Sequence, residues 1–214
     1  LGTYALLSDE TCRFLAIDFD KEGWRRDIAT LLSICSSFEI PVAVERSRSG
    51  NGAHVWFFFE SPIAASAARK FGSALITHAM NKNHGIPFTS YDRLFPNQDT
   101  LPKGGLGNLI ALPLQKQARY NCNSVFIDEN FEPYNHQWEY LSAISRISEE
   151  TVVSLTMRLC GPDELGDLRR DDEEIEKPWE QKRQVRLTVQ DFPSALTLVR
   201  ANMIFIPKAG ISPK

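Results

Sequence analysis

Apolar residues recur with two different periods along the first two thirds of the chain, and these periods predict the secondary structure. Residues 13–19 and 54–60 are short apolar runs rich in strand-forming residues, and the second run is apolar enough for a strand buried on both faces. Residues 23–38 carry apolar side chains at helical spacing, and the Ala-rich residues 63–82 also predict a helix. The chain therefore predicts helices that pack on a sheet.

Shorter segments complete the predicted elements. We expect strands at 42–45, 91–94, 109–114 and 125–127, helices at 136–147 and 149–159, and near the end of the chain a strand at 185–189, a helix at 194–201 and a strand at 203–206. The turn-rich residues 47–52 (SRSGNG) join two strands and predict a hairpin, so the sheet is not purely parallel. This mixed order of elements predicts an α+β, or mixed α/β, fold.

Composition and charge divide the chain into three parts. Its 214 residues are 43% hydrophobic, which suits one good-sized domain with an appendage and excludes wholesale disorder. The formal net charge of −3 at first argues against a nucleic-acid partner, but residues 161–184 alone hold 9 acidic and 5 basic residues. We therefore predict a body over 1–160, an acidic linker over 161–184 and a C-terminal segment over 185–214.

The sequence also argues against some settings. No apolar run approaches the ~18 residues of a membrane span, and no charged-then-apolar leader opens the chain, so we expect no membrane association and a cytoplasmic protein. The four cysteines form no CxxC pair, which fits a reducing compartment better than a disulfide framework. The chain begins with Leu1, and we expect it to be a processed or excised piece of a larger protein.

The first candidate for chemistry is the pair Asp18 and Asp20. Residues i and i+2 of a strand point to the same face, so the two carboxylates would lie side by side after an apolar run. Such a pair is electrostatically unfavourable unless a cation lies between the carboxylates, and hard divalent ions prefer oxygen ligands. The simpler alternative is a strand that ends in solvent with acidic residues in the turn.

The second candidate is the loop over 46–54 (RSRSGNGAH). It contains no acid, its arginines and hydroxyls can donate to phosphate, and its glycines let the backbone approach an anion closely. The loop is not a Walker motif, because the GK[ST] signature is absent. The alternative is a glycine-rich hairpin with ordinary surface arginines.

The third candidate is Asp92 together with the loop that follows it. Asp92 could supply a third carboxylate, and from Arg93 to Arg119 the chain has four basic residues and one acid. Lys103 precedes two glycines, which makes it a plausible phosphate contact, whereas a solvated loop is the alternative.

The order of these motifs resembles that of the archaeo-eukaryotic primase, or primase-polymerase, superfamily. The matching pieces are IDFD at 17–20, RSGNGAHVW at 48–56 and SYDRLFPNQ at 90–98. The resemblance is greatest to the primase domain of TOTE conflict system proteins, which are large bacterial proteins that also carry helicase and nuclease modules. It covers about residues 4–146, and residues 202–210 are similar to the segment that leads toward the helicase. It implies the archaeo-eukaryotic primase fold, with an RRM-like catalytic sheet and a flanking αβ unit.

The resemblance also implies roles for individual residues. Asp18, Asp20 and Asp92 match metal-binding, catalytic carboxylates, and His54 matches a histidine that contacts the phosphates of the incoming nucleotide. The other residues implied in nucleotide binding are Arg48, Ser49, Asn51, Gly52, Gln98 and Lys103.

The implied function is metal-dependent, template-directed nucleotidyl transfer by a DNA primase, a DNA polymerase or both. Nucleotides from NTP or dNTP would be added to a 3′-hydroxyl with release of pyrophosphate, and Mg²⁺ or Mn²⁺ would occupy a two-metal site. The implied partners are a DNA template and primer, and helicase or nuclease modules in the full-length protein. A non-catalytic domain that binds nucleic acid or nucleotide, and a two-metal nuclease, are the alternatives.

Overall fold

The structure is a computed structural model of the whole chain, and it describes residues 1–82, 87–101, 105–160, 196–199 and 204–207. The chain divides into two compact units, Leu1–Arg170 and Asp171–Lys214. The predicted linker over 161–184 and the predicted strand over 185–189 lie outside the described residues, so the three-part division stays a prediction.

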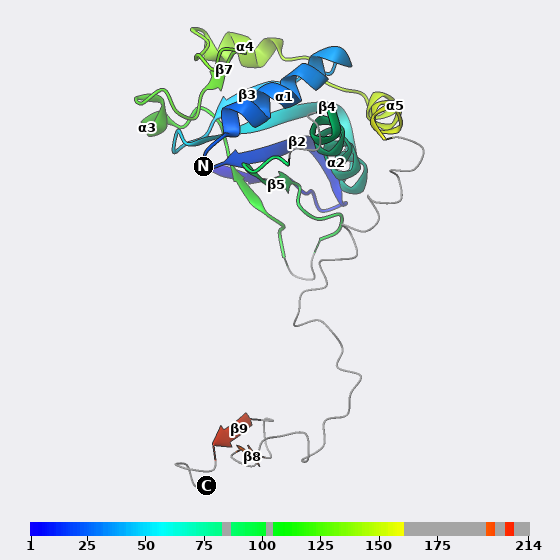
Figure 1. The fold of residues 1–214 in the computed structure, drawn as a ribbon, viewed down its shortest axis with the longest axis vertical. Helices are drawn as coiled ribbons and strands as arrows, with labels where there is room; N and C mark the ends of the chain where they lie inside the picture. The colour runs from blue at the N-terminus through cyan, green and yellow to red at the C-terminus, as the bar shows by residue number, and fades with distance from the viewer. Residues whose placement is uncertain (83–86, 102–104, 161–195, 200–203, 208–214) are drawn as a thin grey trace. The chain divides into compact units, whose positions relative to one another are not determined.

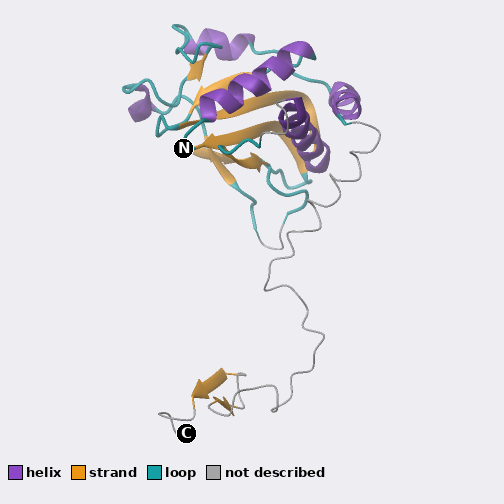
Figure 2. Cartoon of the chain, viewed as in Figure 1, coloured by secondary structure: helices purple, strands orange, loops and turns teal. Residues whose placement is uncertain are grey.

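A five-stranded antiparallel sheet forms the centre of the first unit (Figures 1 and 2). Its strands follow the spatial order β5 (Tyr91–Phe95), β2 (Thr11–Asp20), β4 (Gly52–Ala64), β3 (Ala43–Arg46) and β7 (Phe126–Ile127). A separate two-stranded sheet pairs β1 (Gly2–Tyr4) with β6 (Leu109–Ala111). Together with the helices, these sheets confirm the predicted α+β class, and β3 and β4 form the predicted hairpin.

Two long helices, α1 (Trp24–Ser37) and α2 (Ala65–Lys82), pack against β2, β4 and each other, and α5 (Glu149–Leu159) packs on α2. Among the described residues, the other helices, α3 (Lys116–Arg119) and α4 (Gln137–Ala143), are short. The helix α2 lies close to the sheet because Gly72 has no side chain, and a β-carbon there would lie 2.9 Å from Leu15 Cδ2. Leu15, Ile17 and Phe19 alternate along β2 and are fully buried, so this face of the strand belongs to the core.

Several element boundaries differ from the predictions. β4 continues to Ala64, where Thr11 pairs with it, so α2 begins at Ala65 rather than at residue 63. β6 ends at Ala111, ahead of Pro113, and α4 covers only part of the predicted 136–147. The strand β1 and the helix α3 were not expected, since each is only three or four residues long.

The prediction of a helix over 194–201 is wrong. The structure has a strand, β8 (Leu196–Val199), which pairs antiparallel with β9 (Ile204–Pro207). The segment alternates leucine with the β-branched Thr197 and Val199, a pattern that favours a strand once a partner strand is available. Among the described residues, no helix has both the length and the apolar character that a membrane span requires.

The packing of α2 on the sheet leads to a test of the core. Phe71 on α2 and Phe57 on β4 are both fully buried, with ring centroids 5.5 Å apart and ring planes at 84°. The substitution Phe71→Ala should lower the free energy of unfolding by about 3–5 kcal/mol, measured by urea denaturation, because it removes this contact and leaves a cavity. Met157→Ala on α5 is the control; its side chain is exposed, so the change should stay within about 0.5 kcal/mol. Equal losses in both variants would contradict this description of the core.

Candidate active site

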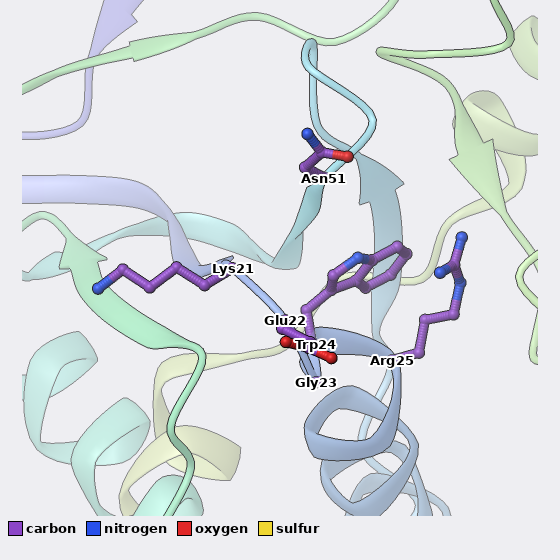
Figure 3. Close-up of a pocket in the computed structure, with 6 residues that line it drawn as sticks. All are labelled: Lys21, Glu22, Gly23, Trp24, Arg25 and Asn51. Carbon is purple, nitrogen blue, oxygen red and sulfur yellow. The ribbon is translucent and has the colours of Figure 1, made fainter.

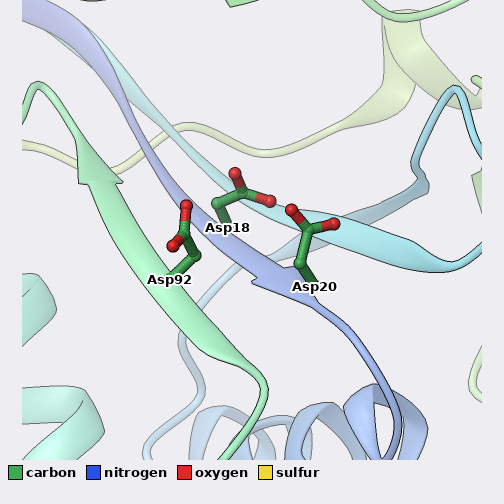
Figure 4. Close-up of side chains that lie close together, drawn as sticks. All are labelled: Asp18, Asp20 and Asp92. Atoms are coloured by element: carbon green, nitrogen blue, oxygen red, sulfur yellow. The ribbon is translucent and has the colours of Figure 1, made fainter.

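Three carboxylates meet at one edge of the central sheet (Figure 4). Asp18 and Asp20 lie on β2 and Asp92 lies on β5, and each offers an oxygen within 4.8 Å of the others. Asp18 and Asp20 point to the face of β2 opposite to the buried Leu15, Ile17 and Phe19, because their positions alternate with these core residues. The structure thus brings together the three acidic residues that the sequence singled out, and their role as metal ligands stays a prediction.

An irregularity in β5 explains how Asp92 joins this cluster. Asp18 pairs with Arg93 and Phe19 pairs with Tyr91, so Asp92 is an extra residue between the two pairs. A bulge of this kind places two consecutive residues opposite one and re-aims their side chains. Strict alternation would have sent Asp92 and Arg93 to opposite faces, whereas here Arg93 Nε donates to Asp92 Oδ2 over 2.6 Å.

The start of β5 is anchored to the helix α1. The carbonyl of Ser90 accepts a hydrogen bond from the backbone N–H of Asp20 over 2.7 Å. The hydroxyl of Ser90 donates to Asp27 Oδ2 over 2.6 Å, and its backbone N–H donates to the same oxygen over 3.2 Å. Because Asp27 lies on α1 and is 1% exposed, this network fixes the chain just before Asp92 against the end of β2.

His54 lies beside the carboxylates and links them to a buried acid on β3. In the sheet register Asp18 faces His54 across β2 and β4, and Glu45 faces His54 across β3 and β4. His54 Nε2 lies 3.5 Å from Asp18 Oδ1, and His54 Nδ1 lies 3.0 Å from Glu45 Oε2. Burial by itself lowers the pKa of His54, but the hydrogen bond to Glu45 and the charges of Glu45, Asp18 and Asp20 outweigh it and raise that pKa.

The pKa of Asp18 is raised to about 6. Burial is the largest cause, and the charges of Asp20 and Asp92 raise it further, while His54 and Arg93 lower it. In the metal-free protein the Asp18 carboxylate is therefore held in an environment that disfavours its negative charge. A divalent cation among the three carboxylates would reverse this preference, because it offsets both the repulsion and the lost hydration. The oxygen-only donor set fits a hard cation such as Mg²⁺ or Mn²⁺.

The loop over 47–52 is folded tightly against the end of β2. Gly52 pairs with Asp20, and a β-carbon at Gly52 would overlap the carbonyl oxygen of Phe19 and lie 2.6 Å from Asp20 Oδ1. The loop is closed by the backbone N–H of Ser47, which donates to the Gly52 carbonyl over 2.9 Å, and by the Ser49 hydroxyl, which accepts from the Asn51 N–H over 3.2 Å. The absence of a side chain at Gly52 is thus required for Asp20 to take its place.

A pocket of about 410 Å³ lies between this loop and the turn that follows Asp20 (Figure 3). Its lining residues are Lys21, Glu22, Gly23, Trp24, Arg25 and Asn51. The guanidinium of Arg25 lies 4.5 Å from the centre of the Trp24 ring, a cation–π contact at one wall. Asn51 extends from the loop on the opposite side (Figure 3). The pocket therefore provides space next to the carboxylate-bearing strand, and Asn51 reaches it.

The remaining predicted nucleotide contacts are less closely grouped. Arg48 is exposed at the tip of the loop, and its carbonyl accepts from Asn123 Nδ2 over 3.4 Å. Gln98 lies beyond the C-terminal end of β5, with its amide nitrogen buried next to Gly107, and its role in nucleotide binding stays a prediction. Lys103 lies outside the described residues.

Two residues of the site were not identified from the sequence. The sequence pattern predicts only a strand residue at Glu45 and a basic segment that begins at Arg93, although each is a direct partner of a predicted site residue. The signal for Glu45 was present in the hairpin. A six-residue loop over 47–52 places Arg46 opposite Ala53, and therefore Glu45 opposite His54. The signal for Arg93 was absent, because a bulge in β5 cannot be read from alternation.

The fold and this site define an α+β protein with a candidate carboxylate metal centre at the edge of an antiparallel sheet. The family model described as the TOTE conflict system, archaeo-eukaryotic primase domain, matches residues 1–155. The chain therefore belongs to this family, which confirms the resemblance inferred from the three motifs. A comparison with curated proteins gives no significant match.

The raised pKa of Asp18 predicts how stability depends on pH and metal. The pKa is about 6 in the folded protein against an ordinary 3.8, so without metal the folded state binds the proton more tightly than the unfolded state. The free energy of unfolding that Asp18 contributes is therefore lost as the pH rises from about 4 to about 6. Removing the charge by Asp18→Asn should raise the metal-free unfolding temperature at pH 7 by about 2–4 °C. It should also abolish the rise that Mg²⁺ or Mn²⁺ produces in the wild type.

Thermal unfolding with and without divalent metal, at pH 5 and pH 7, provides the measurement. In the wild type the metal-induced rise should be smaller at pH 5, because protons compete with the cation for Asp18. Glu60→Gln, which removes an exposed carboxylate on β4, should behave as the wild type does. Metal stabilisation that survives Asp18→Asn would show that the cation binds elsewhere.

Proposed function

We propose that this domain is a template-directed nucleotidyltransferase that acts as a DNA primase, a DNA polymerase or both. The observation that carries the proposal is the cluster of Asp18, Asp20 and Asp92 next to the Ser-Gly-x-Gly-x-His loop, in a chain that belongs to a primase-domain family. The reaction would add a nucleotide from NTP or dNTP to a 3′-hydroxyl and release pyrophosphate. We place it in the cytoplasm, within a larger protein that carries helicase or nuclease modules.

The carboxylates supply what such a reaction requires of the protein. Mg²⁺ or Mn²⁺, when bound, would supply positive charge for the attacking and leaving oxygens of the in-line displacement. Asp18, Asp20 and Asp92 would hold the cations, and their oxygens lie within 4.8 Å of one another. Arg93 holds Asp92 through a 2.6 Å hydrogen bond, and Ser90 holds the strand before it. These hydrogen bonds help to fix the position of Asp92 relative to β2.

The loop residues would bind the triphosphate. His54 Nε2 points toward Asp18, so a nucleotide whose phosphates meet the cations would also come within reach of this nitrogen. A raised pKa favours the positively charged imidazolium at His54, which suits a phosphate contact. Ser49, Asn51 and the exposed Arg48 would contact the outer phosphates, and the pocket beside Asn51 offers room next to the cluster. Gln98 and Lys103 remain expectations from the resemblance alone.

The two alternatives predict different products. A two-metal nuclease would use the same carboxylates to bind metal ions that activate water for hydrolysis. It would not require a loop that binds a nucleoside triphosphate. A non-catalytic domain would bind metal and nucleotide without turnover. His54 Nε2 lies 3.5 Å from Asp18 Oδ1, and Glu45 contacts the other ring nitrogen. A histidine beside the carboxylates could bind the phosphates of a nucleotide, which favours the transferase.

A synthesis assay tests the proposal. Purified protein with Mg²⁺ or Mn²⁺ and a DNA template, with and without primer and with NTPs and dNTPs in parallel, should give products that lengthen with time. Asp92→Asn should reduce the rate at least about a hundredfold, since loss of a metal ligand removes several kcal/mol of transition-state stabilisation. Glu60→Gln should retain the wild-type rate. Shortening of the template would favour the nuclease, and nucleotide binding with no product would favour the non-catalytic domain.

Template binding should depend strongly on salt. Contacts between basic side chains and phosphates release counterions, so the logarithm of the association constant should fall linearly with the logarithm of salt concentration. Lys116 and Arg119 are exposed on α3 within the basic segment, and the double substitution Lys116→Gln/Arg119→Gln should reduce the slope for single-stranded DNA by about 1.4. Fluorescence anisotropy at several salt concentrations measures the slope. Lys70→Gln on α2 is the control, and a wild-type affinity that does not change with salt would contradict a basic template surface.

A further inference from the structure

A buried acid on β3, Glu45, lies outside the carboxylate cluster of Asp18, Asp20 and Asp92. Glu45 is 2% exposed, and three side chains face its carboxylate. His54 Nδ1 lies 3.0 Å from Oε2, Trp56 Nε1 donates to the same oxygen over 3.2 Å, and the Ser124 hydroxyl donates to Oε1 over 3.1 Å. A buried carboxylate is strongly unfavourable unless donors replace its hydration, and the two oxygens here have such donors. Glu45 is therefore held firmly in one place.

The surroundings of Glu45 are themselves rigid. Ser124 has a left-handed backbone with φ of 54°, and its N–H donates to the carbonyl of Arg46 over 2.9 Å. Trp56 is 2% exposed, and its ring lies at 78° to the His54 ring with centroids 6.0 Å apart. Arg46, the next residue on β3, donates to the carbonyls of Cys122 and Phe131 over 3.0 and 2.6 Å. The carboxylate thus has little freedom to move relative to β4.

This environment fixes the His54 ring. Trp56 Nε1 and the Ser124 hydroxyl donate to the two Glu45 oxygens, so the side chain serves as an acceptor and we infer that His54 Nδ1 carries the proton it shares with Glu45. With Nδ1 tied to Glu45 on one side, Nε2 is turned to the other side, where it lies 3.5 Å from Asp18 Oδ1. Because Nδ1 is hydrogen-bonded to Glu45, the His54 ring cannot flip or rotate without breaking that bond.

We propose that Glu45 is a positioning residue that sets the orientation of the His54 imidazole, so that Nε2 faces the carboxylate cluster. The inference rests on the proposed function only where it assigns nucleotide phosphates to that nitrogen. Glu45 itself touches neither substrate nor metal ligands, and it acts through His54 alone.

The first experiment observes the ring directly in the metal-free wild type. Long-range proton–nitrogen NMR correlations in histidine-labelled protein distinguish the two ring nitrogens, and His54→Gln assigns the His54 signals. A proton on Nδ1 is expected, whether or not Nε2 also carries one. A neutral ring with its only proton on Nε2 would overturn the proposal, because that tautomer cannot donate to Glu45.

The second experiment is a double-mutant cycle on nucleotide incorporation. Glu45→Leu removes the acceptor and should lower kcat/KM for the nucleotide about 10- to 100-fold. Glu45→Gln can still accept through its amide oxygen and should recover most of this loss. In the His54→Gln background Glu45→Leu should change kcat/KM less than about twofold, since two residues that act as one unit are not additive. Equal losses in both backgrounds would overturn the proposal.

Matched controls separate positioning from folding. Glu60→Leu makes the same change as Glu45→Leu at an exposed position of β4, outside the network of Glu45 and His54, so it should preserve kcat/KM and the imidazole spectrum. If Glu45→Leu does not fold, as thermal unfolding would show, Glu45→Gln and the wild-type spectrum decide the matter. If the wild type makes no product, the proposed function fails, while the imidazole spectrum still supports or overturns the orientation of His54 by Glu45.

Discussion

The structure depends on the antiparallel pairing of β2 with β4 on one side and β5 on the other. That pairing places Arg93, Asp18, His54 and Glu45 in one row across four strands, although these residues are far apart in the sequence. Residues that face each other across antiparallel strands project from the same face of the sheet, so the row becomes a continuous set of charged and polar contacts. A shift of one residue in either pairing would send part of this set into the core.

The same row concentrates charge where the protein interior disfavours it. Burial and two neighbouring carboxylates raise the pKa of Asp18 to about 6, and Glu45 is fully buried. The protein balances these charges differently. Glu45 is satisfied by three donors within the fold, whereas Asp18 lies beside the carboxylates of Asp20 and Asp92, with His54 and Arg93 as opposing charges. The hydrogen bonds of Glu45 offset the cost of burying its charge, whereas the repulsion around Asp18 would be relieved by a cation.

Much of the site was open to prediction because its signals are local. The Asp-x-Asp spacing, the glycine-rich loop and the apolar strands around them are each contained in a few consecutive residues, and their order led to the primase-domain family that matches residues 1–155. The long helices and the β3–β4 hairpin were predictable for the same reason. The role of Gln98 stays a prediction from its place in a motif, because it lies beyond the C-terminal end of β5, where its amide nitrogen is buried near Gly107.

By itself, the sequence determined which residue types are available and which strands and helices carry them, because apolar period and turn chemistry are properties of short segments. Only the tertiary structure decided which side chains meet. The bulge that turns Asp92 toward Asp18, the absence of a side chain at Gly52 that admits Asp20, and the Glu45 carboxylate behind His54 all depend on strand pairing. The strand β8, predicted as a helix, shows the same limit, since its conformation is decided by its pairing with β9. Hydrogen bonds between distant segments select among conformations that local preference leaves nearly equal in free energy.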